Sequence, residues 1–243
     1  MSSPSHSDPT MLPPPGYRDL AAACQVYEPA FRLCFDYLTS VRIAGAVLEF
    51  GTYRGFTARL MATIIKQLDY PAKLYLYDSF EGLPDSSATA DGHSYEISEN
   101  KRWSKGSMAL EPGIDELILR SLSRILPPAR LTIIKGFFAD TLDHNLPAEK
   151  AALIHVDCDL YASAKTVLER LMERDLFQDG CLLLFDDYNC NRASPFMGER
   201  RAFNEVFGRQ SRWSYSSFFR YGWHGWAFFV HDTRASDALP AGE

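Results

Sequence analysis

The sequence lacks several features that would place it in common classes of protein. No apolar stretch approaches the ~18 residues of a membrane-spanning helix, and the first sixteen residues, MSSPSHSDPTMLPPPG, contain no apolar core of a secretory signal. The GxGxxG and P-loop motifs that bind a pyrophosphate are missing. There is no long basic run, and the net charge of -6 disfavours nucleic acid and anionic membranes as partners.

The cysteines are few and irregularly spaced. There are five, an odd number, and none forms a CxxC motif. This pattern argues against a disulfide framework and against a zinc site, because both need closely paired cysteines. We therefore expect reduced thiols in a cytoplasmic protein.

The 243 residues are 46% hydrophobic, which suits a single domain with a full core. The Ser/Pro-rich residues 1–16 are predicted to form a disordered tail, and residues 17–243 one domain. Within it, residues 80–110 are polar and rich in Gly, Ser and Asp. A loop of that length in a compact domain predicts a lid insertion.

Apolar runs and helical patterns alternate along the chain. Helices are expected at 17–40 (one or two, with a possible break at Pro29), 55–68, 111–124 (Pro112 in its first turn), 161–174 and 199–207. Strands are expected at 46–51, 73–78, 130–136, 151–157, 180–187, 212–219 and 225–232. The alternation predicts an α/β fold with a mostly parallel sheet covered on both faces. Nothing helical fits between the last two strands, which can therefore pair antiparallel.

Two acidic clusters follow two of these apolar runs. Asp157 and Asp159 lie in ALIHVDCDLY, and Asp186 and Asp187 lie in CLLLFDDY. Carboxylates at the ends of buried strands are costly unless they are neutralised, and adjacent aspartates repel each other. Oxygen donors suit Mg²⁺, Mn²⁺ or Ca²⁺ better than zinc. We predict that Asp157, Asp186 and Asp187 bind a divalent cation; the alternative is that individual aspartates cap helices.

Asp159 lies two residues past Asp157, beyond the predicted strand end. It can therefore face a substrate instead of the ion and accept a proton from a hydroxyl as general base. The alternative is a helix cap, since a helix is expected to start at Tyr161.

A glycine turn, LEFGTYRGFT, follows the first predicted strand. Gly51 and Gly55 allow a ligand to approach the backbone, and Asp78 at the end of the next strand can accept both hydroxyls of a ribose. Alternatively, the glycines serve tight strand–helix packing and Asp78 caps a helix. Glu49, inside the first strand, needs a hydrogen-bonding or cationic partner. A glycine turn, a ribose-binding acid and a metal-like cluster in this order suggest a methyltransferase that uses S-adenosylmethionine.

Together these motifs resemble the macrocin O-methyltransferase (TylF-like) family over roughly residues 45–210. The matching stretches are LEFGTYRG, LYDSFEGLP, KGFFADTL, HVDCDLYAS, FDDY and GERRAFNEVF. The resemblance implies a Rossmann-like class I methyltransferase fold, with seven strands, a closing antiparallel pair and N-terminal helices. It also implies magnesium on Asp157, Asp186 and Asp187, with Asp159 as catalytic base. The cofactor site that it implies comprises Glu49, Gly51, Thr52, Tyr53, Thr57, Asp78, Ser79 and Asp157.

The sequence departs from the family pattern at two places near the acidic motif. Cys158 stands where the family has glycine, and Ala162-Ser163-Ala164 replaces Glu-Ser-Thr. The predicted function is a Mg²⁺-dependent O-methyltransferase acting on a hydroxyl of a small natural product, sugar or otherwise. An N- or C-methyltransferase on the same fold, or a metal-dependent hydrolase or binding protein, is the alternative. The family also implies a homo-oligomer.

Overall fold

A computed structural model describes residues 8–87 and 89–236 of the chain. Its centre is one sheet of seven strands in the order β3-β2-β1-β4-β5-β7-β6. The first five are parallel to one another, whereas β7 pairs antiparallel with both β5 and β6. The strands are β1 (Ala46–Phe50), β2 (Leu74–Asp78), β3 (Leu131–Lys135), β4 (Ala151–Val156), β5 (Leu182–Phe185), β6 (Trp213–Tyr221) and β7 (Gly225–Asp232).

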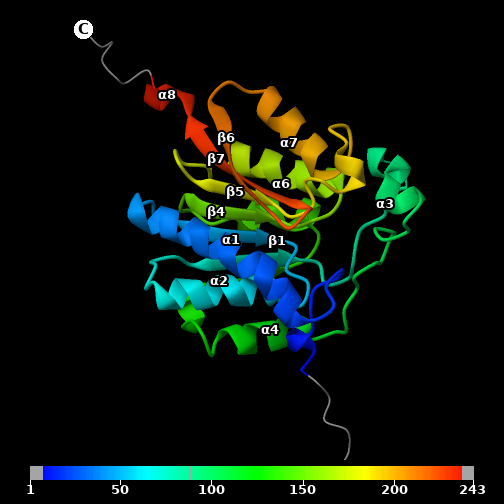
Figure 1. The fold of residues 1–243 in the computed structure, drawn as a ribbon, viewed down its shortest axis with the longest axis horizontal. Coiled ribbons are helices and arrows are strands. Elements are labelled where there is room, and N and C mark those ends of the chain that lie inside the picture. The colour runs from blue at the N-terminus through cyan, green and yellow to red at the C-terminus, as the bar shows by residue number, and fades with distance from the viewer. Residues whose placement is uncertain (1–7, 88, 237–243) are drawn as a thin grey trace, which may run out of the picture.

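Helices cover both faces of the sheet (Figure 1). One face carries α1 (Leu20–Ser40), α2 (Phe56–Gln67) and α4 (Ile114–Leu122), and the other carries α5 (Phe138–Asn145), α6 (Tyr161–Glu173) and α7 (Gly198–Gly208). The short helices are η1 (Pro9–Met11), η2 (Ala90–His93), α3 (Tyr95–Ser98), η3 (Pro128–Arg130), η4 (Asn191–Ala193) and α8 (Thr233–Ser236).

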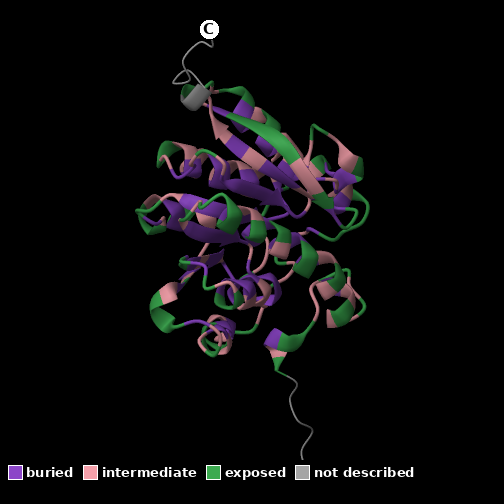
Figure 2. Cartoon of the chain, turned by 60° about the vertical axis from the view of Figure 1, so that its left-hand side comes forward, coloured by how far each residue is buried: buried purple, intermediate pink, exposed green. Residues whose placement is uncertain are grey.

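The strands divide their side chains between two cores, because successive residues point to opposite faces. In β1, Val47 packs against α1, α2 and α4, whereas Leu48 and Phe50 pack against the other layer. All five residues of β1 are buried, as expected for a central strand of a parallel sheet covered on both sides. Figure 2 shows this buried centre, with exposed residues on the outer faces of the helices, in loops and on the outer strand β6.

The predicted architecture is confirmed. The parallel strands have the order 3-2-1-4-5, and the two aromatic-rich C-terminal strands form the closing antiparallel pair. All the strands and long helices that the pattern predicts are present, within a few residues of their expected ends.

Three local details differ from the expectations. Helix α1 runs through Pro29 without ending, so the N-terminal helical region is one long helix. Pro112 lies just before the N-cap residue of α4, Gly113, and is outside the helix. Helix α5 was not expected between the third and fourth strands, because its eight residues bury only Thr141 and Leu142 and its apolar pattern is correspondingly weak.

The predicted tail and lid are partly described. Residues 1–7 lie outside the described residues, whereas residues 8–16 include η1 and rest on α2, where Nη2 of Arg59 donates to the carbonyl of Thr10 at 3.0 Å. Residues 80–110 contain η2 and α3, and Ala88 is not described. The division into a tail and one domain with a lid stays a prediction. Across the described part of the chain, no helix is long and apolar enough to cross a membrane.

The core of α1 can be tested with two substitutions on one helix. Phe35 is fully buried against Tyr70, whereas Leu33 is 44% exposed. We expect Phe35→Ala to lower the free energy of unfolding by about 3–5 kcal/mol, because it leaves a cavity. Leu33→Ala should change it by less than about 0.5 kcal/mol. Urea denaturation measures both; equal losses would contradict the packing described.

Candidate active site

The ends of the central strands are held side by side by a ladder of main-chain hydrogen bonds. The amide of Gly51 donates to Tyr77, the amide of Asp157 to Phe50, and the amide of Asp186 to Val156, all at 2.8–2.9 Å. Gly51 has a φ of +97°, and a Cβ there would lie 1.7 Å from the carbonyl oxygen of Asp157. Only glycine lets β1 end so close to β4.

A cavity of about 320 Å³ opens at this edge of the sheet. Every predicted site residue except Glu49 lines it, which brings the glycine turn, the end of β2 and both acidic clusters into one space. The lining residues from the prediction are Gly51, Thr52, Tyr53, Thr57, Asp78, Ser79, Asp157, Asp159, Asp186 and Asp187.

Asp157, Asp186 and Asp187 form a compact acidic cluster. Each offers an oxygen, and the three oxygens lie within 4.8 Å of one another. Burial and the charges of Asp186 and Asp187 raise the pKa of Asp157 well above its ordinary value. Burial and Asp186 also raise the pKa of Asp187, to about 6. Among the described residues, no lysine or arginine forms an ion pair with any of the three.

Asp186 differs from Asp157 and Asp187 because a tyrosine and two histidines lie close to it. Its Oδ2 accepts a hydrogen bond from Tyr27 at 2.8 Å, its main-chain oxygen lies 2.7 Å from Nδ1 of His224, and its Oδ1 lies 3.8 Å from Nε2 of His155. Although burial raises the pKa of Asp186, His155, His224 and Tyr27 outweigh it and hold the pKa below its ordinary value. These contacts therefore favour the ionised form of the carboxylate.

Glu49 has the partner that its position in β1 requires. Its Oε1 lies 3.3 Å from Nδ1 of His155, and both side chains are fully buried. Burial lowers the pKa of His155, but Asp186 and Glu49 outweigh that effect and raise the pKa to about 9. Glu49 thus lies beneath the cavity, where it supports His155 and through it Asp186, and it does not line the space predicted for a cofactor.

Asp159 does not cap the following helix. Leu160 is the N-cap residue of α6 and makes no side-chain cap hydrogen bond, and the first amides of α6 bond instead to Asp91. Asp159 is 6% exposed, has a left-handed φ of +61°, and lies against Asp187 at the cavity wall. Burial and the charges of Asp187 and Glu199 raise its pKa well above the ordinary value.

Glu199, which the sequence did not single out, joins the two acidic loops. It is fully buried in the first turn of α7; Oε1 accepts from the amide of Cys158 at 3.0 Å, and Oε2 accepts from the amide of Asp187 at 2.9 Å. One carboxylate therefore fixes the spacing of the loops that carry Asp157 and Asp187. The sequence signal that could have identified Glu199 is its position in the first turn of the helix that follows the second acidic cluster.

Asp78 organises the glycine turn. Its Oδ2 accepts from the amide of Tyr53 and its Oδ1 from the amide of Phe80, both at 2.7 Å. Burial raises the pKa of Asp78 despite these hydrogen bonds. Each oxygen keeps a second lone pair, so the carboxylate can still accept hydroxyl groups from a ligand in the cavity.

Further wall residues come from segments outside the predicted site. Phe137 and Phe138 follow β3, Trp103 belongs to the 80–110 segment, and Pro14 comes from the N-terminal stretch. The first pair could have been found, because parallel strands bring their carboxyl ends to the same edge. Trp103 belongs to the segment predicted as a lid, whereas Pro14 could not have been found, because only the tertiary fold brings that Pro-rich stretch to the cavity.

The cluster fits a hard divalent cation. All of its donors are oxygens, and Oδ1 of Asp186 is buried without a hydrogen-bond partner. Asp157 and Asp187 repel each other and Asp186 in the absence of a positive charge. Asp157, Asp186 and Asp187 are the residues that could hold the ion.

A sequence model of one family, macrocin O-methyltransferase (TylF), matches residues 29–207, about three quarters of the chain. The chain belongs to this family. The match contains the glycine turn, Asp78, both acidic clusters and Glu199, and it leaves out the N-terminal wall residue Pro14 and the two C-terminal strands.

Individual relatives agree with the family. A tetracenomycin-C 4'-O-methyltransferase from Streptomyces olivaceus (full name 8-demethyl-8-(2,3-dimethoxy-alpha-L-rhamnosyl)-tetracenomycin-C 4'-O-methyltransferase) is 28% identical over 64% of this chain. Demethyldecarbamoylnovobiocin O-methyltransferase from Streptomyces niveus is 25% identical over 70% of it. The matched segments span 57% and 63% of these two relatives' lengths.

The fold is that of class I methyltransferases. The crystal structure of a calicheamicin methyltransferase superposes with a TM-score of 0.65 and 17% sequence identity, covering 94% of each chain. The predicted fold class is therefore confirmed.

The role of Glu199 can be tested by Glu199→Gln. The amide group would turn an N–H toward one of the two backbone amides, so we expect a loss of roughly 1–3 kcal/mol in the free energy of unfolding. Glu205→Gln on the same helix breaks a partly exposed ion pair with Arg201 and should cost less than about 1 kcal/mol. Denaturant titration in EDTA compares them. An unchanged Glu199→Gln stability would show that the carboxylate does not hold the loops.

Proposed function

We propose that this protein transfers the methyl group of S-adenosylmethionine to a hydroxyl of a small natural product, with Mg²⁺ or Mn²⁺ at the acidic cluster. The observation that carries the proposal is the cavity that joins the glycine turn and Asp78 to Asp157, Asp186 and Asp187. Methyl transfer needs the donor and the activated hydroxyl in one space, and this arrangement provides for both.

The donor side lies over β1 and β2. Gly51 and Thr57 leave room for the donor's amino-acid part beside the start of α2, and Asp78 can accept the ribose hydroxyls. Phe137 and Phe138, at the end of β3, offer an apolar wall for the adenine. The donor would then point its sulfonium methyl toward the ends of β4 and β5.

The acceptor side lies over β4 and β5. A divalent cation on Asp157, Asp186 and Asp187 would supply positive charge that lowers the pKa of a hydroxyl next to it. Tyr27, His155 and His224 keep Asp186 ionised and in place, and Glu199 fixes the spacing of the other two ligands. The chain's own residues thus orient the ligand set before any substrate arrives.

Asp159 is proposed as the general base. Besides burial, the negative charge of Asp187 and Glu199 raises its pKa. Once that charge is neutralised, Asp159 can ionise and accept the proton of a hydroxyl at the cavity wall. Its left-handed backbone, at φ +61°, turns the residue away from the direction of the strand.

The acceptor is proposed from the family and the relatives. The relatives named above methylate oxygen atoms of tetracenomycin- and novobiocin-type compounds according to their names. A hydroxyl on a sugar or another part of a secondary metabolite is therefore the proposed acceptor. Residues 80–110 are proposed as a lid over the bound acceptor. A homo-oligomer is also proposed, by analogy with the family, and light scattering would measure it.

Removal of the metal should abolish turnover. We expect EDTA to lower the rate of methyl transfer to a panel of glycosylated natural products by roughly a thousandfold, because several kcal/mol of charge stabilisation are lost. Added Mg²⁺ should restore it. NMR of the product identifies the methylated atom. Full activity in EDTA would reject the metal, and an N- or C-methyl product would reject the proposed acceptor class.

Replacement of the base should separate chemistry from binding. Asp159→Asn should lower turnover at least a hundredfold, whereas calorimetry should find S-adenosylhomocysteine bound as in the wild type. Asp140→Asn, an exposed change on α5, is the matched control. Undiminished turnover of Asp159→Asn would remove it from the mechanism. A wild-type protein that does not bind S-adenosylhomocysteine would instead favour a hydrolase or a binding protein.

A further inference from the structure

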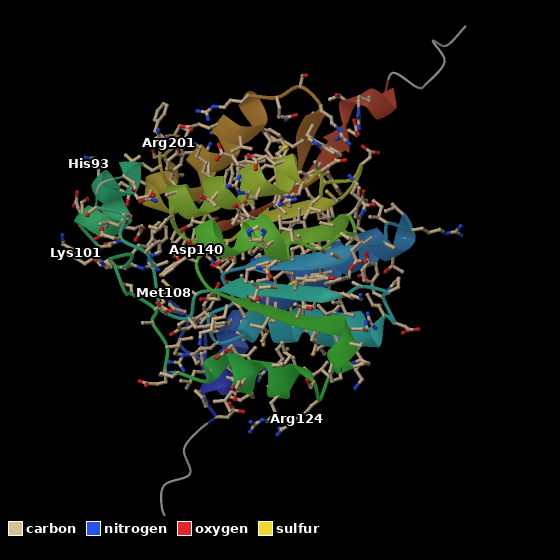
Figure 3. All side chains as sticks on the ribbon, turned by 180° about the vertical axis from the view of Figure 1, so that it is seen from behind. His93, Lys101, Met108, Arg124, Asp140 and Arg201 are labelled. Carbon is tan, nitrogen blue, oxygen red and sulfur yellow. The ribbon has the colours of Figure 1, made fainter. Side chains whose placement is uncertain are left out.

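Residues 89–110 form an outlying segment that covers the cavity. Figure 1 shows its helix α3 set apart from the main body, and Figure 3 shows His93 and Lys101 of the same segment at the edge of the molecule. Despite this position, Asp91, Glu96 and Trp103 are only 1–3% exposed. Such burial in a polar, outlying stretch indicates that specific contacts hold it against the body.

The main contact is an unusual helix cap. Oδ1 of Asp91 accepts the amide of Tyr161 at 2.7 Å, and Oδ2 accepts the amide of Ala162 at 3.0 Å. These are the first two amides of α6, which have no partner within the helix, and Leu160 at the N-cap supplies none. A carboxylate at this end also interacts favourably with the helix dipole. The segment, distant in sequence, thus completes α6.

Two weaker contacts join the segment to the loops that carry the acidic residues. Trp103 packs with Leu160, which follows Asp159, and with Cys190. The amide of Glu96 donates to Oδ1 of Asn191 at 3.2 Å. The segment therefore rests on the loop after β4 and on the loop after β5, and it places Trp103 in the cavity wall.

We propose that Asp91 is a positioning residue, a latch that holds segment 89–110 closed over the cavity by capping α6. Opening the segment would free the two α6 amides and lift Trp103 from the wall, so closure depends on the geometry of the Asp157–Tyr161 loop. The latch depends on the proposed function in one respect: the closed cavity is proposed to retain the methyl donor and its product. Its structural part stands independently.

The test compares the full-length wild type with Asp91→Asn and with Glu99→Gln. Asparagine keeps one oxygen acceptor but turns an N–H₂ group toward the second amide. Glu99 is an exposed carboxylate of the same segment that does not line the cavity, and Glu99→Gln serves as control. Thr89→Ala is a milder second variant, since the Thr89 hydroxyl accepts the amide of Asp91 at 3.2 Å.

Hydrogen exchange followed by mass spectrometry gives the first result. We expect Asp91→Asn to speed exchange in peptides covering 89–103 and 160–163 by roughly five- to tenfold, as for loss of a typical helix cap, with a smaller effect for Thr89→Ala. Exchange in β1 and β4 should not change. Unchanged exchange at 89–103, or a uniform increase through the sheet, would overturn the latch.

The rate at which S-adenosylhomocysteine dissociates distinguishes a latch from a merely structural role of Asp91, which would leave that rate unchanged. Stopped-flow dissociation should be several-fold faster for Asp91→Asn, with Mg²⁺ affinity unchanged, and equal to wild type for Glu99→Gln. Equal release rates in Asp91→Asn and wild type would overturn the gating role. If the wild type fails to bind S-adenosylhomocysteine, the proposed function fails, while the exchange measurement still decides whether Asp91 is a latch.

Discussion

Repulsion among carboxylates at one edge of the sheet is the constraint on which the site depends. Asp157, Asp186 and Asp187 meet there because β1, β4 and β5 end side by side, and that alignment requires Gly51. Histidine and tyrosine side chains stabilise the charge of Asp186 on the side away from the cavity. Glu199 holds the backbone amides of both acidic loops but adds a further negative charge. The side facing the cavity has no such partner among the described residues, and the proposed divalent cation would lie there.

The same alignment gives the cavity two chemically different halves. Over β1 and β2, glycine, small hydroxyl residues and Asp78 offer a surface suited to a nucleoside, and over β4 and β5 the acidic residues offer one suited to a cation and a hydroxyl. The two halves touch because strand order reverses between β1 and β4, the usual place for ligands in such sheets. The proposed chemistry depends on this adjacency more than on any single residue.

Much of this arrangement follows from local sequence, and the remainder depends on contacts distant in sequence. Strand ends can be predicted because a buried strand is a continuous apolar run, so Asp157 and Asp186 are placed correctly by pattern alone. The roles of Glu49 and Asp159 depend on neighbours in space. Glu49 faces His155 across the β1–β4 pair, and Asp159 is free of α6 only because Asp91, 68 positions earlier, caps that helix. The spacing of apolar residues along the sequence carries no information about such tertiary partners.

The acidic edge of the sheet is proposed to hold one divalent cation. The most direct measurement is Mn²⁺ titration followed by electron paramagnetic resonance, in which the signal of free Mn²⁺ counts the bound ions. One site per chain is predicted for the wild type and for Asp140→Asn, and loss of that site for Asp187→Asn. The absence of a site in the wild type, or undiminished binding by Asp187→Asn, would contradict the account.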